Sequence, residues 1–110
     1  MANTFKLKTK ANVGVTTVGI YTAPAATTTV VIGITLANTS GSGVNVGVGI
    51  TRAGTTEDVK LLKNAPIPQG SSLEFMAGNK VVLETTGDTL TVDSDTNNSI
   101  DAALTIMEIT

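Results

Sequence analysis

Two β-branched segments indicate the fold class: Thr28-Thr-Val-Val-Ile-Gly-Ile-Thr-Leu-Ala37 and Val44-Asn-Val-Gly-Val-Gly-Ile-Thr51. Both have an apolar residue at every second position, namely Val30, Ile32, Ile34 and Leu36 in the first and Val44, Val46, Val48 and Ile50 in the second. A period of two over this length predicts β-strands that each bury one face. The residues between them, Asn38-Thr-Ser-Gly-Ser-Gly43, are typical of a turn.

The composition of the whole chain points the same way. Its 110 residues include 20 Thr, 12 Val and 8 Ile, whose β-branched side chains suit a pleated strand better than a helix. The 11 Gly also disfavour helices, because each costs roughly 1 kcal/mol in a helix interior. We therefore predict one all-β domain over residues 1–110.

Shorter runs with apolar residues at alternate positions predict the remaining strands. They cover residues 5–7, 13–20, 59–62, 72–76, 80–84, 89–93 and 100–109. Turn-forming residues separate them, as in Pro66-Ile-Pro-Gln-Gly70. In the last run, Met107 and Ile109 take the opposite phase to Ile100–Ile106, which suggests a bulge or a tail packed on another element. About eight short strands at this spacing predict an antiparallel β-sandwich, jelly-roll or Ig-like.

Several classes of function are excluded by residues that the chain lacks. It has no His, Cys or Trp, so Ser-His-Asp and Cys-His mechanisms, zinc sites and disulfides are excluded. The net charge of −2 argues against nucleic-acid binding. No apolar run approaches the ~20 residues that cross a bilayer, and no apolar stretch follows the basic N-terminal residues as in a signal peptide. We expect no cofactor, no nucleic-acid partner and no membrane partner.

Two loop motifs invite a ligand-binding interpretation. Gly41-Ser-Gly-Val-Asn-Val-Gly47 is one residue off the dinucleotide pattern, and because no helix is predicted after it, we interpret it as a hairpin loop. Asp93-Ser-Asp-Thr-Asn-Asn-Ser-Ile-Asp101 places oxygen ligands at alternate positions, as a calcium loop does. An EF-hand needs Gly at its sixth position and Glu at its twelfth, where this chain has Asn98 and Leu104. We favour a solvated hairpin tip over a weak cation site.

Charged side chains raise two further possibilities. Paired carboxylates hydrolyse glycosides, and the candidates are Glu57, Asp58, Glu74, Glu84, Asp88 and Glu108. Sugar sites normally add aromatic platforms, whereas the aromatic residues here are Tyr21, Phe5 and Phe75, so we predict that the chain is not an enzyme. Lys6, Lys8 and Lys10 form either an exposed strand face or a patch that docks on an acidic partner.

The predicted outer faces of the sheets are rich in Thr and Gly and poor in charge. Charged residues make up only 15% of the chain, and the strands lack the Lys and Glu that usually protect sheet edges. Such faces are suited to being covered by a neighbouring chain. We therefore expect the protein to self-associate, as a dimer or trimer.

Five segments, in order along nearly the whole chain, carry a resemblance to a known family. They are Met1-Ala-Asn-Thr-Phe-Lys6, Val31-Ile-Gly-Ile-Thr-Leu-Ala-Asn-Thr-Ser-Gly-Ser-Gly43, Leu62-Lys-Asn-Ala-Pro-Ile-Pro-Gln-Gly-Ser-Ser-Leu-Glu74, Lys80-Val-Val-Leu-Glu-Thr-Thr-Gly-Asp88 and Leu104-Thr-Ile-Met-Glu-Ile-Thr110. Together they resemble short virion structural proteins that are encoded by tailed phages of cyanobacteria and other marine bacteria. These motifs are strand and turn chemistry, so the resemblance brings no catalytic residues.

The resemblance implies a β-rich, non-enzymatic component located in the virion, with other virion proteins as partners. One role is a capsid decoration or cement protein, which stabilises the head by binding the major capsid protein. The alternative is a tail, neck or baseplate component, including a host-surface adhesion module. Receptor sites concentrate aromatic residues and Arg. With Arg52 and Tyr21 as its single Arg and Tyr, the chain favours the decoration role.

Overall fold

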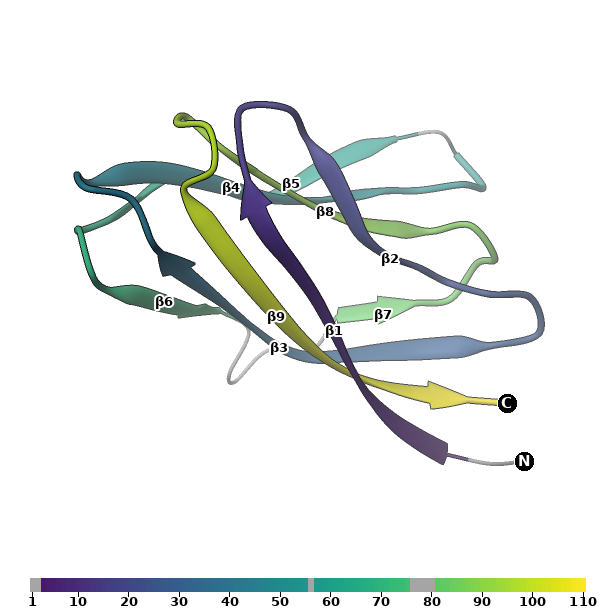
Figure 1. The fold of residues 1–110 in the computed structure, drawn as a ribbon. Helices are drawn as coiled ribbons and strands as arrows, with labels where there is room; N and C mark the ends of the chain where they lie inside the picture. Colours follow the sequence, from purple (N-terminus) through teal and green to yellow (C-terminus); the bar gives the residue numbers. More distant parts are fainter. Residues whose placement is uncertain (1–2, 56, 76–80) are drawn as a thin grey trace.

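A computed structural model describes residues 3–55, 57–75 and 81–110 (Figure 1). These residues form nine strands in two antiparallel sheets. The first, here called the β1 sheet, contains in spatial order β1 (Asn3–Val13), β9 (Ile100–Ile109), β3 (Thr28–Asn38) and β6 (Ser72–Phe75), with β7 (Val81–Leu83) also paired to β3. The second, the β2 sheet, contains β2 (Val18–Thr22), β8 (Thr89–Ser94), β4 (Val44–Thr51) and β5 (Asp58–Ile67). No helix in the described part of the chain is long and apolar enough to cross a membrane.

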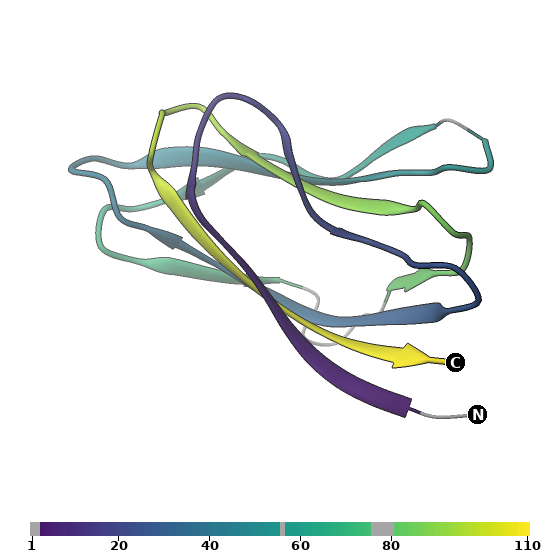
Figure 2. The same cartoon turned by 45° about the vertical axis from the view of Figure 1, so that its right-hand side comes forward.

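The pairing of the strands is that of a jelly roll. β1 pairs with β9, β2 with β8, β3 with both β6 and β7, and β4 with β5, so the chain is one long antiparallel hairpin rolled into two sheets. β6 and β7 lie along the same edge of β3, so the nine strands occupy eight positions. The two sheets stack face to face, and the chain ends lie next to each other at one end of the β1 sheet (Figures 1 and 2). The predicted all-β antiparallel sandwich is confirmed.

The core between the sheets is almost entirely aliphatic. As predicted, β4 buries Val44, Val46, Val48 and Ile50. The core-facing positions of β8, beside β4, and of β9, in the other sheet, bury Leu90, Val92, Ile100, Ala102, Leu104 and Ile106. Each fully buried Val, Leu or Ile contributes about 1.5–3 kcal/mol relative to an exposed one, so these positions dominate the stability of the fold.

Strand β3 does not keep the single phase that its sequence predicts. Its buried residues are Thr29, Val31, Ile34, Leu36 and Asn38. The register against β9 shifts between Val31 and Gly33, so Ile32 is the extra residue of a β-bulge. A bulge exchanges the two faces of a strand, and the prediction that Val30 and Ile32 lie in the core is therefore wrong. Both side chains are half-buried, on the outer face of the β1 sheet.

Strand β9 also differs from its prediction, in the opposite sense. Its alternation continues unbroken to the end: Ile106 and Glu108 are buried, whereas Met107 and Ile109 are half-buried on the outer face. The apparent change of phase arises because a charged residue, Glu108, takes a core position. The predicted bulge, or tail packed on another element, is absent from β9, whose residues pair with β1 and β3 up to Ile109.

The N-terminal strand is longer than predicted. Residues 3–13 form one edge strand, where the sequence suggested a strand at 5–7 and a second over 13–20. Its register shifts between Lys10 and Val13, and Asn12 adopts a positive φ of 59° there, which Asn tolerates well. Val13 is buried after this bulge, and residues 14–17 then cross to the β2 sheet.

Strand β5 extends beyond the predicted 59–62 and includes Pro66 and Ile67, so the predicted turn begins only at Pro68. Proline is compatible with this strand because β5 is an edge, which leaves one side of its backbone unpaired. Asn64 has a φ of 56° beside a register shift, which marks a bulge in β5. The predicted turn at 77–79, together with Met76 and Lys80 at its flanks, lies outside the described residues.

Candidate functional site

The outer face of the β2 sheet is small and polar. Its central positions are Gly47 and Gly49 of β4, both covered by neighbours. A Cβ on Gly47 would collide with the Asp93 carboxylate, and one on Gly49 would lie 2.9 Å from the carbonyl oxygen of Val59. The other positions on this face carry Thr, Asn, Asp, Lys or Pro, namely Asn45, Thr51, Asp58, Lys60, Pro66, Thr89 and Thr91. The predicted outer face rich in Thr and Gly is found on this sheet.

The outer face of the β1 sheet is different, because large apolar side chains lie on it. Directly paired residues share a face, so Phe5, Met107, Val30 and Val82 form one row across four strands. Phe5 is 68% exposed and Val82 is 51% exposed. The next row begins with Leu7, which is 65% exposed. We call this patch the apolar ridge; its members are Phe5, Leu7, Val30, Ile32, Val82 and Met107.

The other half of the same face is formed by small side chains. Further rows contain Thr9, Ala103 and Thr35, and beyond them Ala37 beside Asp101. Two shallow grooves of about 300 and 360 Å³ lie over these residues. We call this half the small-residue trough; its members are Thr9, Ala11, Thr35, Ala37 and Ala103. The sequence singled out neither half, because the bulge at Ile32 sets which β3 residues face outward.

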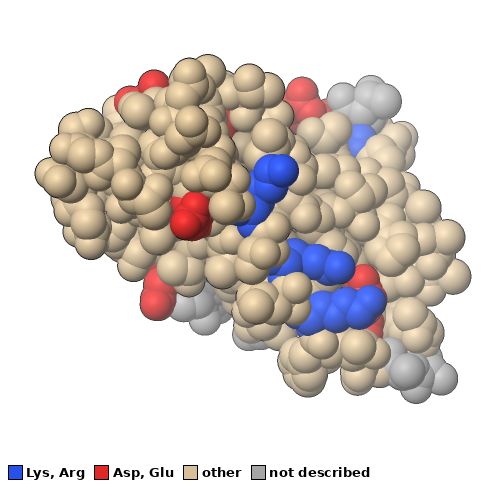
Figure 3. All heavy atoms as spheres, in the orientation of Figure 1, with Lys and Arg blue, Asp and Glu red and all other residues tan. Residues whose placement is uncertain are grey.

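The three N-terminal lysines lie on the inward side of the edge strand. Lys6, Lys8 and Lys10 pair across the sheet with the buried residues Ile106, Leu104 and Ala102, so they share the core-facing side of β1. Figure 3 shows lysine side chains in a row over β1. Inward-pointing lysines on an edge strand hinder pairing with other chains. The expectation that the edges lack such protection is therefore wrong for β1.

Glu108, a candidate catalytic carboxylate, belongs to a buried polar network that joins the two sheets. The Tyr21 hydroxyl of β2 donates to Glu108 Oε2 at 2.6 Å and lies 2.7 Å from Thr29 Oγ1 of β3. Lys6 Nζ lies 2.8 Å from Glu108 Oε1. The hydrogen bonds from Lys6 and then Tyr21 lower the pKa of Glu108, despite the desolvation that opposes them. Burial, followed by the bond to Glu108, raises the pKa of Tyr21 to about 12.

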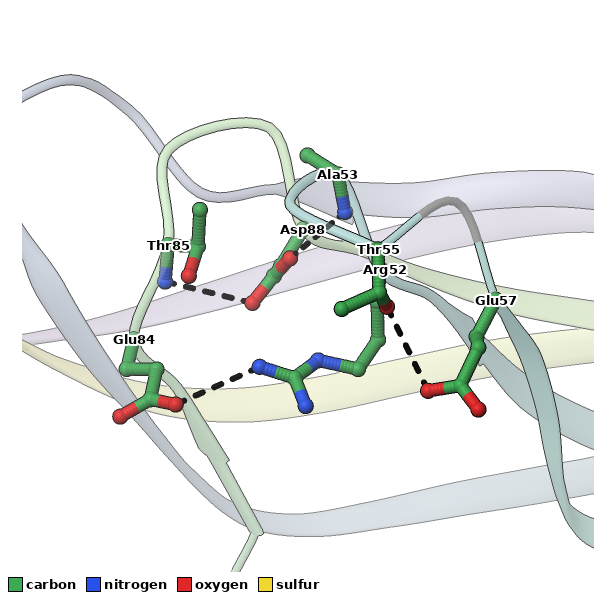
Figure 4. Close-up of polar contacts among 7 residues, drawn as sticks. All are labelled: Arg52, Ala53, Thr55, Glu57, Glu84, Thr85 and Asp88. Carbon is green, nitrogen blue, oxygen red and sulfur yellow. Dashed lines mark hydrogen bonds and ion pairs between the residues drawn. The ribbon is translucent and has the colours of Figure 1, made fainter.

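Three other carboxylates gather where the β4–β5 and β7–β8 connections meet (Figure 4). Asp88 is buried and accepts hydrogen bonds from the backbone amides of Ala53 at 2.9 Å and Thr85 at 3.2 Å. Arg52 Nη2 lies 3.3 Å from Glu84 Oε1 at the surface, and Glu57 accepts from the Thr55 hydroxyl. Asp88 thus ties two loops together, which is a structural role.

The two remaining candidates lie apart from this cluster and from Glu108. Asp58 is at the β4–β5 edge, where it accepts from the Thr51 hydroxyl at 2.9 Å. Glu74 lies on the outer face of the β1 sheet, opposite Thr35. The six candidate carboxylates therefore lie in four separate places. The hydrogen bonds described for them hold parts of the scaffold together.

We expect Asp88→Ala to lower the free energy of unfolding by about 2 kcal/mol, because it leaves two backbone amides without their buried acceptor. Asp95→Ala is the matched control. Asp95 is exposed, so the amide of Asn45 that it accepts from can bond to water instead, and the change should be below about 0.5 kcal/mol. Urea denaturation measures both. Equal losses would contradict the role assigned to Asp88.

The side-chain oxygen atoms of the 93–101 loop, which was weighed as a weak cation site, are directed to different segments. Asp93 accepts from the Thr17 hydroxyl at 3.1 Å, Asn97 from the Val15 amide at 3.4 Å and Asp101 from the Asn12 amide at 3.0 Å. In the described residues, no group of three His, Cys, Asp or Glu side chains is placed to hold a metal ion. The loop packs the β8–β9 connection onto the β1–β2 connection.

The glycine-rich segment 41–47 connects β3 to β4 and enters β4 at Val44. Asn38 organises it: its side-chain amide donates to the carbonyl oxygens of Ser42 and Ile67, both at 2.9 Å, and its Oδ1 accepts from the Ser40 amide. A strand follows the loop, as the hairpin interpretation requires, and no helix N-terminus is present there to bind an anion.

No protein-family model and no curated protein matches the sequence. Among solved structures, the fold is similar to a chain of the Bacillus endospore appendages, described as a novel family of disulfide-linked pili, with a TM-score of 0.60 and 16% identity over 99% of this chain and 87% of that chain. It is also similar to a chain of infectious bursal disease virus, Gx strain, with a TM-score of 0.53 and 15% identity over 96% of this chain and 28% of that chain. These likenesses show the fold.

Proposed function

We propose that the protein is a non-enzymatic structural subunit of a tailed-phage virion, and specifically a decoration protein that binds the major capsid protein and stabilises the head. The apolar ridge carries this proposal. Phe5, Leu7 and Val82 are each more than half exposed on one continuous sheet face. A contiguous exposed apolar patch marks an interaction surface, so this face works when another protein covers it.

The fold supports a role as a building block. The two similar structures come from a pilus and from a virus, both of which are assemblies of repeated subunits. The pilus is described as disulfide-linked, whereas the 110 residues of this chain contain no Cys. The absence of Cys excludes disulfides between subunits, and an apolar face supplies contacts through buried area instead. The resemblance of its sequence to phage virion proteins supports the same class of assembly.

The composition of the exposed patch favours decoration over host recognition. Receptor-binding hot spots are enriched in Trp, Tyr and Arg. In the described structure, Phe5 is the aromatic residue of the ridge, Tyr21 is buried and Arg52 is held beside Glu84. A tail, neck or baseplate component remains the second candidate, and the likeness to a pilus subunit favours it, because tail proteins also stack along an axis.

Copy number in purified particles of the phage that encodes the chain tests the proposal. Quantitative mass spectrometry should find hundreds of copies per particle, and a cryo-EM map should place them on the outer surface of the head. A dozen copies or fewer, located in the tail, would support the second candidate. Absence from purified particles would contradict both.

A further inference from the structure

We propose that the N-terminal part of β1, residues 3–10, is an arm that two copies of the chain exchange, so that the arm of each copy pairs with β9 of the other. Phe5 and Leu7 lie on this arm. The apolar ridge of each subunit then contains two side chains supplied by its neighbour. The inference goes beyond the proposed function and leaves the outer face of the β1 sheet free for the partner named there.

The arm contributes little to the core of its own chain. All of its side chains are exposed except Lys8, which is half-buried, and the first buried side chain of β1 is Val13. Its core-facing side chains are lysines, whose ammonium groups stay in water. β1 is also the edge of its sheet, so the arm has one neighbouring strand, β9 (Figure 1). Segments with so few buried contacts open at low free-energy cost.

A hinge separates the arm from the anchored end of β1. The arm pairs with β9 without interruption, and the register breaks between Lys10 and Val13. Asn12 lies in this break with a φ of 59°, in the left-handed region. After it, Val13 is buried, and its carbonyl oxygen accepts a hydrogen bond from the amide of Ser99 at 3.1 Å. Rotation about the backbone of Asn12 therefore redirects the arm while Val13 stays in place.

The edge of β9 that the arm covers is specific for this arm. Glu108 of β9 is buried, and its Oε1 lies 2.8 Å from Lys6 Nζ. Removal of the arm leaves this buried carboxylate without its cationic partner and opens the backbone edge of β9, both of which are unfavourable. The arm of a second copy restores both contacts, because it brings the same lysine in the same register.

Exchange costs few contacts, because the closed and exchanged forms contain the same strand pairs. The two forms differ at the hinge, which we expect to become extended in the exchanged form. A left-handed residue with a side chain is less stable than an extended one, so the hinge favours exchange. In an assembly of many copies, neighbouring arms reach effective concentrations of about 1 mM. We therefore expect exchanged dimers at high concentration and closed monomers at low concentration.

Cysteine cross-linking tests the proposal, because the natural chain has no Cys. Leu7 pairs directly with Thr105, and both side chains are exposed. Leu7→Cys and Thr105→Cys chains are mixed in urea, refolded together at about 1 mM and oxidised. Peptide mapping should find a disulfide between position 7 of one chain and position 105 of the other. Directly paired residues have Cα atoms about 4.5–5.5 Å apart, which a disulfide can span.

A second pair of variants is the matched control. Thr35 and Ala103 also pair directly, but they lie on β3 and β9, which stay together in one chain in both forms. Mixed Thr35→Cys and Ala103→Cys chains should therefore form no disulfide between positions 35 and 103. A control bond as abundant as the bond between 7 and 105, or no bond between 7 and 105, would overturn the proposal.

Hinge substitutions test the cause of exchange. Asn12→Val should tighten dimerisation at least about tenfold, because a β-branched residue avoids the left-handed region and each dimer contains two hinges. Asn64→Val makes the same change at a φ of 56° in β5, away from the arm, and should dimerise as the wild type does. Light scattering from about 1 µM to about 1 mM measures both. Equal dimerisation of the two variants would contradict exchange at this hinge.

The outcomes separate this inference from the proposed function. A chain that forms only closed monomers yet is abundant on phage heads would count against arm exchange alone. A chain that exchanges arms as described but is absent from virions would count against the proposed function alone.

Discussion

Ile34→Asp is expected to abolish folding. Ile34 is 2% exposed, and it pairs across the β1 sheet with the fully buried Leu104. An unpaired carboxylate at this position loses its hydration and gains no partner, which costs several kcal/mol in addition to the lost apolar contacts. Because domains of this size are stable by only about 5–15 kcal/mol, one such substitution removes most of the stability. Circular dichroism and urea denaturation measure the loss.

Ile32→Asp is the matched control, because it makes the same chemical change two residues away. Ile32 is the extra residue of the bulge and lines the outer groove, so an aspartate there can reach water. We expect this variant to fold with a loss below about 1.5 kcal/mol. An unfolded Ile32→Asp variant beside a folded Ile34→Asp variant would show that the faces of β3 are the reverse of those described.

Stability should fall at both ends of the pH range, with a contribution from Glu108 at the acid end and from Tyr21 at the alkaline end. The pKa of Glu108 is lower in the folded chain than its ordinary value of 4.5, so the stability that it contributes is complete above pH 4.5 and is lost as the pH falls through the folded value. The pKa of Tyr21 is raised from 10 to about 12, so stability is complete below pH 10 and declines as the pH rises towards 12.

Two variants separate these effects. Glu108→Gln should lower the free energy of unfolding by about 2 kcal/mol at neutral pH, because it weakens the bonds to Lys6 and Tyr21, and it should flatten the acid decline. Tyr21→Phe should flatten the alkaline decline, because no phenol then titrates between the sheets. Urea denaturation from pH 3 to pH 12 tests both. An acid decline of wild-type size in Glu108→Gln would refute the assignment to Glu108.

Strand β4 shows that an alternating sequence pattern can predict correctly which residues are buried. Its alternation is unbroken, and the structure buries Val44, Val46, Val48 and Ile50 as the pattern predicts. In β3 the pattern is equally clear in the sequence, but Ile32 is an inserted bulge residue. A bulge changes which side of the strand meets the core without changing the order of residue types, so periodicity alone cannot locate it.

The interaction surface was predicted only in outline. Low charge and a high Thr and Gly content indicated faces that a neighbour covers, and the β2 sheet has such a composition on its outer face. The apolar ridge, however, needed the register. Phe5 and Leu7 are exposed because β1 is the edge strand, with Lys6 and Lys8 on the side that faces inward. Their alternation in the sequence is the same whichever side faces the core.

The candidate carboxylates show the same limit. The sequence grouped Glu108 with five other acidic residues, because nothing in its neighbours distinguishes it from a solvated one. The structure separates them through contacts that are distant along the chain: Tyr21 reaches Glu108 across 87 positions, and the amide of Ala53 reaches Asp88 across 35. Burial and the direction of the pKa shift of Glu108 depend on these contacts.

The all-β class, the positions of most strands and the absence of thiol and imidazole chemistry follow from the order and types of residues, because strand propensity and residue inventory are local properties. The folded arrangement was needed to show which faces of β1 and β3 point outward, that Glu108 is held between the sheets and that a ridge and a trough share one face. Those features depend on register and on bulges, and one inserted residue reverses every side chain beyond it.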